Sequence, residues 1–264
     1  MNKIDKKVLK KFCDDFWFSP SDILVRAREE RIWRDIEFKR PVLDIGCGDA
    51  RIGKDLFWNK KQFDVGLDAD IKEIENAKKL KMYKKLIVAD AADMPFRSRS
   101  FYSVVSNSTF EHIEDDEEAI KEISRVLRKG GRFYMTTTTD RLRKTFKRNL
   151  TPSEYKQINT RLHHLHYRSI DEWKKILEKN NLKIIEYKYY FDDVDIEEWI
   201  RLFKITTFNF FNRELWSYLH DPRVSKFLPN NIFSSVIFTF FKKRFRDKIF
   251  TEKGNWIYIV AQKQ

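Results

Sequence analysis

The chain has 264 residues, of which 42% are hydrophobic and 35% charged, and this balance is typical of a soluble globular protein. A net charge of +13 favours a polyanionic partner, either nucleic acid or an anionic lipid surface. The charged N-terminus has no uninterrupted apolar stretch behind it, which argues against a secretory signal, and no apolar run reaches the roughly 18 residues of a membrane span. Cys13 and Cys47 are far apart in sequence, which favours a reducing, cytoplasmic compartment over a disulfide framework.

Residues 1–40 have the pattern of a helical segment ahead of the first strand. Ser19-Pro20-Ser21-Asp22 is typical of a helix start. The segment also contains a cluster of aromatic residues at Phe12, Phe16, Trp17 and Phe18. We expect residues 1–40 to form an N-terminal helical cap that covers a ligand cleft.

Residues 42–58 have the pattern of a strand, a tight turn and a helix. Three apolar residues run into a turn with Gly46 and Gly48, and glycine permits the positive φ and the close ligand approach that such a turn requires. Asp68 ends the next apolar run, where a carboxylate can accept both hydroxyls of a ribose. A nucleotide cofactor is therefore predicted. A dinucleotide fingerprint would need a third glycine where the chain has Arg51, which disfavours a dehydrogenase.

These motifs resemble those of the class I S-adenosylmethionine (SAM)-dependent methyltransferases, including the ubiquinone and menaquinone biosynthesis enzymes. Asp44, Gly46 and Gly48 match the family's D-x-G-x-G loop, and Asp68 matches its ribose-binding acid. The segment 89–96 is similar to the family's third-strand motif, in which the residue at Asp90 reaches the adenine amino group. Further matches, at 101–106, 110–113 and 125–133, extend the resemblance over about residues 41 to 140.

The resemblance implies SAM as cofactor and an enzyme that transfers its methyl group. The methyl carbon of a sulfonium is already activated, so the protein mainly positions the reactants, with at most one general base and no metal. The cofactor-binding residues expected from the resemblance and the adjoining turns are Asp44, Gly46, Cys47, Gly48, Asp68, Ala69, Asp90, Ala91 and Ser106.

Strands alternate with helices along the first half of the chain, which predicts a parallel, doubly wound α/β sheet. The expected strands are 42–45, 63–68, 86–89, 101–106 and 132–138, with helices near 51–59, 71–80 and 116–128 and a helix stop at Gly130-Gly131. Two later runs, 182–190 and 256–261, resemble the final antiparallel pair of the methyltransferases. The expected fold is a Rossmann-like, seven-stranded sheet with an antiparallel last strand.

We expect a SAM-binding core at 41–190, a helical insert at 191–254 and a last core strand at 255–264, because a structureless connection as long as the insert is uncommon. The insert is rich in Phe and Trp. Residues 231–244 would form a helix with one apolar face at Ile232, Phe233, Val236, Ile237, Phe240 and Phe241. With the basic cluster that follows, residues 232–248 suit an anionic membrane interface; the same face could instead pack on the core or a second subunit.

The expected acceptor is a hydroxyl or carbon of a small, amphipathic or lipid-linked molecule. With such an acceptor, we expect the protein in the cytoplasm, peripheral at the inner membrane face. Nucleic acid ranks lower, because Ser106-Asn107-Ser108-Thr109 stands where a base methyltransferase has an N-P-P-Y tetrapeptide. A catalytically silent SAM-binding scaffold protein is the further alternative.

Titratable residues cluster most densely at His163-His164-Leu165-His166-Tyr167, just before a capped helix that starts at Ser169. A neutral imidazole can remove a proton from an attacking hydroxyl, so His166 or His164 is the expected base and His112 a secondary candidate. The alternative is that these histidines only shape a loop. No metal site is expected, because no carboxylate or cysteine at ligand spacing completes the histidines.

Overall fold

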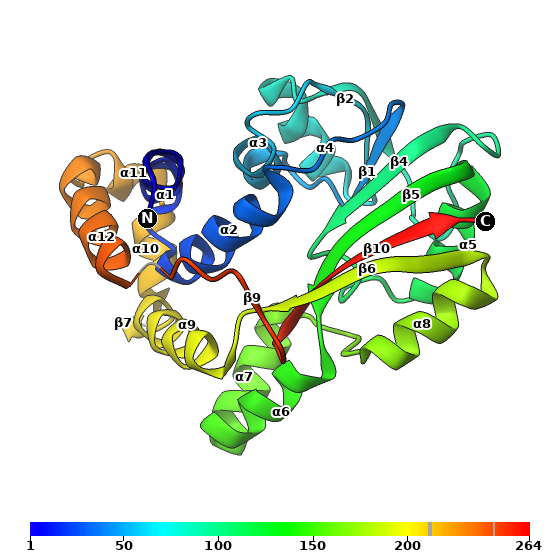
Figure 1. Cartoon of the computed structure of the whole chain (residues 1–264). Helices are drawn as coiled ribbons and strands as arrows, with labels where there is room; N and C mark the ends of the chain where they lie inside the picture. The colour runs from blue at the N-terminus through cyan, green and yellow to red at the C-terminus, as the bar shows by residue number, and fades with distance from the viewer. Residues whose placement is uncertain (211–212, 245) are drawn as a thin grey trace. The chain divides into compact units, whose positions relative to one another are not determined.

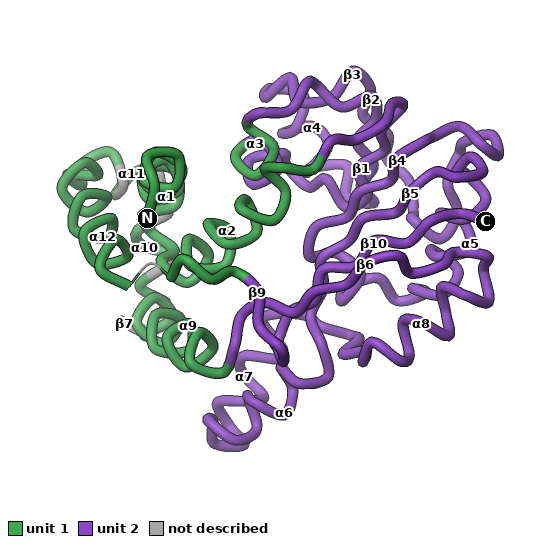
Figure 2. Tube along the Cα trace, in the orientation of Figure 1, with its two compact units in different colours: residues 1–36, 55–58, 193–249 green, residues 37–54, 59–192, 250–264 purple. Residues whose placement is uncertain are grey.

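The computed structural model describes residues 1–210, 213–244 and 246–264 and divides the chain into two compact units (Figures 1 and 2). Unit 1 consists of Met1–Ile36, Asp55–Trp58 and Asp193–Ile249. Unit 2 consists of Glu37–Lys54, Asn59–Asp192 and Phe250–Gln264. The N-terminal helices and the insert, far apart in sequence, therefore belong to one unit.

Unit 2 is built on an eight-stranded sheet in the order β3-β2-β1-β4-β5-β10-β6-β9 (Figure 1). Its strands are β1 (Val42–Ile45), β2 (Phe63–Asp68), β3 (Tyr83–Val88), β4 (Phe101–Asn107), β5 (Leu127–Thr138), β6 (Leu182–Tyr190), β9 (Phe250–Thr251) and β10 (Trp256–Lys263). The pairs among β1 to β5 are parallel, and β10 runs antiparallel to both β5 and β6. The predicted Rossmann-like sheet is confirmed, with two-residue β9 added at its edge.

The chain reverses its direction of winding beside β1, which lies between β2 and β4. Ile45 pairs with Leu67 on one side and with Ser106 on the other, so the ends of these three strands are level. Ligands of open α/β sheets bind outside the carboxyl ends of the strands at such a switch point. This topology therefore places the site at the turns that follow β1, β2 and β4.

Unit 2 also contains six α-helices within the described part of the chain. They are α3 (Arg51–Leu56), whose last two residues belong to unit 1, α4 (Ile71–Ala77), α5 (Asp116–Val126), α6 (Asp140–Asn149), α7 (Pro152–Leu162) and α8 (Ile170–Lys179). The predicted cap of α8 is confirmed: Ser169 and Glu172 form a capping box. The core against α5 and α8 is rich in aromatic rings, and Phe110 meets Phe133 and Trp173 edge-on at 5.5 and 5.7 Å between ring centroids.

The structure differs from the prediction at Gly130-Gly131, which do not end a helix. Helix α5 already ends at Val126, and both glycines lie inside β5. The register between β4 and β5 shifts there, Gly130 has φ +74°, and a Cβ on Gly131 would lie 2.8 Å from the carbonyl oxygen of Arg128. The glycines therefore serve an irregularity within the strand, which demands the same backbone freedom as a helix stop.

Unit 1 is helical apart from a small hairpin. Its elements are α1 (Lys3–Phe16), α2 (Pro20–Trp33), α9 (Asp193–Thr206), β7 (Asn209–Phe210), β8 (Arg213–Glu214), α10 (Leu215–His220), α11 (Pro222–Ser225) and α12 (Asn230–Arg244). Helix α1 packs on α2 and α12, and α2 packs on α9. Residues 211, 212 and 245 of the predicted insert lie outside the described residues, and the last of them belongs to the expected membrane-facing segment 232–248.

Buried ion pairs connect the helices of unit 1. Arg34 contacts Asp5 of α1 at 2.8 Å, and Arg28 of α2 contacts Asp195 of α9 at 2.6 Å. All four side chains are almost entirely buried, with 4% to 12% of their surface exposed. Breaking such a pair by removing one partner is costly, so these contacts favour one arrangement of α1, α2 and α9.

Candidate active site

A cleft of about 460 Å³ lies in unit 2 at the carboxyl ends of the parallel strands. Its walls come from the turns after β1, β2 and β3 and from the segment between β4 and α5. The lining residues are Ile45, Gly46, Leu67, Asp68, Ala69, Ala89, Asp90, Ala91, Ser108, Thr109, His112, Ile113, Glu114 and Asp115. The cleft therefore contains five of the predicted cofactor residues: Gly46, Asp68, Ala69, Asp90 and Ala91.

The glycine turn after β1 is held against the end of β2. The backbone N–H groups of Gly46 and Cys47 both donate to the carbonyl oxygen of Leu67, at 2.8 and 3.1 Å. The N–H of Gly48 donates to the Asp68 carboxylate at 2.8 Å, and Gly46 and Gly48 have φ values of +70° and +51°. Asp68 thus fixes the turn with one oxygen while its carboxylate also lines the cleft.

Two carboxylates at neighbouring strand ends are oriented by backbone donors. Asp68 accepts the N–H of Asp70 at 3.0 Å on its other oxygen, and Asp90 accepts the N–H of Ala92 at 2.8 Å. A carboxylate oxygen can accept more than one hydrogen bond, so both side chains retain acceptor capacity toward the cleft. Both residues line the cleft, where the family resemblance predicts a ribose at Asp68 and a base amino group at Asp90.

The charge of the cleft is opposite to that of the chain. Four carboxylates, at Asp68, Asp90, Glu114 and Asp115, line it, and its described lining contains no Lys or Arg. Such a lining repels the pyrophosphate of a dinucleotide and attracts the sulfonium and ammonium charges of SAM. The residues present therefore fit SAM and do not fit an anionic nucleotide.

The other predicted cofactor residues lie outside this lining. Ser106 is fully buried in β4, and Cys47 is buried, which raises the pKa of its thiol. Asp44 is 4% exposed and accepts the hydroxyl proton of Tyr83 at 2.6 Å, so it connects β1 to β3 beneath the turn. Gly48 shapes the turn through its bond to Asp68. The Ser106 hydroxyl is buried without a hydrogen-bond partner, and contact of these four residues with the cofactor stays a prediction.

Asp44 makes the stability of the protein depend on pH. Burial raises its pKa from 3.8 to about 7, against the opposing hydrogen bond from Tyr83. Between these values the folded protein binds the Asp44 proton more tightly than the unfolded chain does, so the contribution of Asp44 to the free energy of unfolding decreases as pH rises. We expect Asp44→Asn to remove this decrease, as measured by urea unfolding at several pH values from about 4 to about 7. Tyr83→Phe, which removes a bond to the carboxylate, should instead keep the decrease and extend it to higher pH.

The predicted histidines occupy different positions around the cleft. His112 lines the cleft. His164 is largely buried, and its burial and the neighbouring His112 lower the pKa of its imidazole to about 3. His166 contacts the carbonyl oxygen of Glu114 through Nε2 at 3.1 Å. Only His112 therefore presents an imidazole to the cleft, and a pKa of about 3 makes His164 a weak base.

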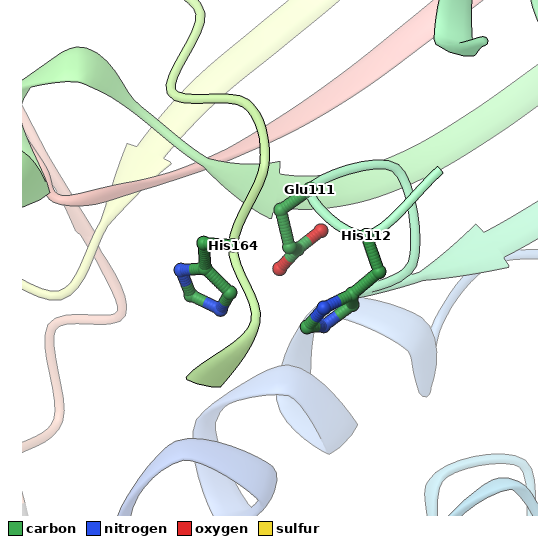
Figure 3. A group of neighbouring side chains, drawn as sticks. All are labelled: Glu111, His112 and His164. Atoms are coloured by element: carbon green, nitrogen blue, oxygen red, sulfur yellow. The ribbon is translucent and has the colours of Figure 1, made fainter. Parts of the chain in front are cut away.

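Sequence reasoning missed Glu111, which the fold brings to His112 and His164 (Figure 3). The loop that carries His164 is tied to the segment after β4, because the N–H of Leu165 donates to the Glu111 carbonyl oxygen at 2.7 Å. A bidentate pair between Arg168 and Asp116, at 2.6 Å for each bond, holds the same loop against α5. The available signal was the Glu111-His112 dipeptide after the fourth strand.

Comparison with known proteins assigns the chain to one family. Residues 43–135 match the family described as "Methyltransferase domain". The ubiquinone biosynthesis O-methyltransferase of Pelagibacter ubique is 30% identical over an alignment of 171 residues that covers 56% of this chain and 69% of that protein. The chain belongs to the class I SAM-dependent methyltransferases, with SAM as the methyl donor.

Solved structures share the same fold. A SAM-dependent methyltransferase from Thermotoga maritima aligns over 98% of this chain and 99% of its own, with a TM-score of 0.59 and 15% identity. The phosphoethanolamine N-methyltransferase 2 of Haemonchus contortus, in complex with SAM, aligns over 88% of this chain and 50% of its own at a TM-score of 0.55 and 16% identity. Two further curated relatives are matched over only 60% and 46% of their length.

Proposed function

We propose that the protein transfers the methyl group of SAM to a hydroxyl or carbon of a small, amphipathic or lipid-linked acceptor. The observation that carries this proposal is the acid-lined cleft at the strand ends, with His112 on its wall. Bound SAM supplies an activated methyl group. The chain's own residues then have three tasks: Asp68 and Asp90 hold the donor, the glycine turn lets it approach the backbone, and the His112 wall orients the acceptor oxygen.

The relatives support an apolar, ring-bearing acceptor class. Named relatives include the ubiquinone biosynthesis O-methyltransferase, a demethylmenaquinone methyltransferase of Thermotoga maritima and a sterol 4-C-methyltransferase of Caenorhabditis elegans. The acid-lined cleft disfavours nucleic acid as the acceptor, since phosphates would meet carboxylates there.

Helix α12 supports delivery from a lipid surface. Its Ser234 is buried and bonds Lys10 of α1 at 3.0 Å, whereas Ile232 and Val236 are each 63% exposed. The apolar face expected from the sequence is therefore divided: Phe241 is buried, and Ile232 and Val236 are left toward solvent ahead of Lys242 and Lys243. Exposed aliphatic side chains beside a basic cluster suit an anionic lipid interface. No helix of the described residues is long and apolar enough to cross a membrane.

Methyl transfer from labelled SAM to a phenol with an isoprenoid tail, presented in phosphatidylglycerol vesicles, tests this proposal. We expect label in the lipid phase. Because two exposed aliphatic side chains no longer contact the lipid, Ile232→Ser/Val236→Ser should lower the affinity for vesicles about tenfold. Activity in detergent micelles should remain unchanged.

Val194→Ser/Ile205→Ser is the matched control, since these aliphatic residues of α9 are also exposed, at 56% and 61%. Equal vesicle binding by all three proteins would refute the membrane part of the proposal. SAM binding without label transfer to any phenol, sterol or quinone precursor would refute the acceptor class.

A further inference from the structure

Glu111, His112 and His164 form a compact group of side chains, of which the proposed methyl transfer uses only His112. One ligand atom from each lies within 4.8 Å of the others. Figure 3 shows the Glu111 carboxylate between the two imidazole rings, whose centroids are 5.0 Å apart. Two imidazoles and one carboxylate, from two segments about fifty residues apart, are the donor types of catalytic zinc sites.

Hydrogen bonds orient two of these side chains as they would in a metal site. Thr137 of β5 donates its hydroxyl proton to Glu111 Oε2 at 3.0 Å. His112 Nδ1 lies 3.2 Å from the carbonyl oxygen of His163, to which it donates as the Nδ1–H tautomer. That tautomer leaves a lone pair on Nε2. Metal-binding histidines typically donate their other ring N–H to a carbonyl or carboxylate, and binding carboxylates are themselves hydrogen-bonded.

The third side chain, His164, has an unusual environment for a histidine that only shapes a loop. Its Nδ1 is buried and has no hydrogen-bond partner. Figure 3 shows the other ring nitrogen, Nε2, on the side of Glu111 and His112, so Nε2 is the atom that would bind an ion.

We propose that Glu111, His112 and His164 bind one divalent transition-metal ion, with zinc as the ion that best suits the donor set, at the wall of the SAM cleft. Magnesium and calcium prefer oxygen ligands, whereas imidazole suits zinc, iron, nickel and copper. Zinc bonds of about 2.0–2.1 Å place ligand atoms about 3.4 Å apart, so each atom would move by less than about 1 Å to close on the ion.

The position of His112 determines what the ion can do. His112 also lines the cleft, so an ion held by His112 would lie at the cleft wall, within reach of an acceptor bound there. This part rests on the proposed function. An acceptor hydroxyl bound to the ion loses its proton to water more readily, because the ion stabilises the oxyanion. The oxygen then forms the new C–O bond as the C–S bond breaks, and the sulfur keeps the electron pair in S-adenosylhomocysteine.

Calorimetric titration of the metal-stripped, full-length protein with zinc tests the site without any acceptor. We expect one zinc per chain, and cobalt in its place should give a visible absorption band. Glu111→Gln and His164→Asn each remove one ligand and should weaken zinc binding at least about tenfold. SAM titration of the same proteins, expected to be unchanged, shows that the variants are folded.

His163→Asn is the matched control. It removes a histidine next to His164 while keeping the backbone carbonyl, and asparagine tolerates the positive φ of +49° at this position. The control should bind zinc like the wild type. Wild-type protein without stoichiometric zinc binding, or ligand variants that bind as tightly as the control, would overturn the site. Zinc binding without methyl transfer to any acceptor would instead count against the proposed function and leave the site standing.

Discussion

Replacing Asp68 with alanine is expected to weaken SAM binding about 10- to 100-fold. Asp68 lies at the end of β2, lines the cleft and accepts the N–H of Gly48 at 2.8 Å. A hydrogen bond to a charged acceptor contributes about 1.5–3 kcal/mol, so the loss of one such bond to the ribose accounts for this range. The substitution also releases the Gly48 N–H, which loosens the turn after β1. Calorimetric titration with SAM measures the effect.

Two further variants separate the effect of the hydrogen bonds to the ribose from the effect of charge on SAM affinity. Asp68→Asn keeps an acceptor oxygen but removes the charge, so we expect an intermediate loss of affinity. Asp93→Ala removes an exposed carboxylate that lies three residues after Asp90 and outside the cleft lining, and it should bind SAM like the wild type. If Asp93→Ala weakened binding as much as Asp68→Ala, net charge rather than ribose contact would be responsible. Unchanged affinity in Asp68→Ala would show that the ribose lies elsewhere.

The sheet could be predicted because its determinants are local. Strands β1, β2 and β4 are short, largely apolar runs, and such runs alternate with amphipathic segments. The Asp68 and Asp90 carboxylates could also be placed, because residues directly after parallel strands reach the same edge of a sheet. Where one local feature serves two purposes, prediction failed: Gly130-Gly131 satisfies a helix stop and an irregular strand equally well.

Contacts between distant segments could not be read from one sequence. The Glu111 carboxylate meets His164 only because the loop at 163–166 bonds back to the segment after β4. Ser234 belongs by periodicity to the polar face of α12, and the structure buries it on α1 through a bond with Lys10. In both cases a polar group takes its role from a tertiary partner, and hydrophobic periodicity contains no information about that partner.

Gly46→Ala is expected to destabilise the protein by about 2–5 kcal/mol. Positive φ costs an L-residue about 1–2 kcal/mol, and forced overpacking adds about 1–3 kcal/mol. Gly46 has φ +70°, and a Cβ there would lie 2.2 Å from Thr109 Cγ2 and 2.8 Å from Thr109 Cβ. Because Gly46 and Thr109 both line the cleft, SAM binding should decrease as well. Urea unfolding followed by tryptophan fluorescence gives the stability, and SAM titration gives the affinity.

Gly130→Ala separates strain from collision, since Gly130 has φ +74° but nothing within 4 Å of an added Cβ. The free energy of unfolding of Gly130→Ala should decrease only by the cost of a positive φ, about 1–2 kcal/mol. The double variant Gly46→Ala/Thr109→Gly removes the collision. Its loss of unfolding free energy should therefore approach the sum of the losses measured for Gly130→Ala and Thr109→Gly. If Gly46→Ala were no less stable than Gly130→Ala, Thr109 would have moved aside at little cost. The close approach of the β1 turn to the segment after β4 would then not require glycine, and the turn would need Gly46 only for its backbone angle.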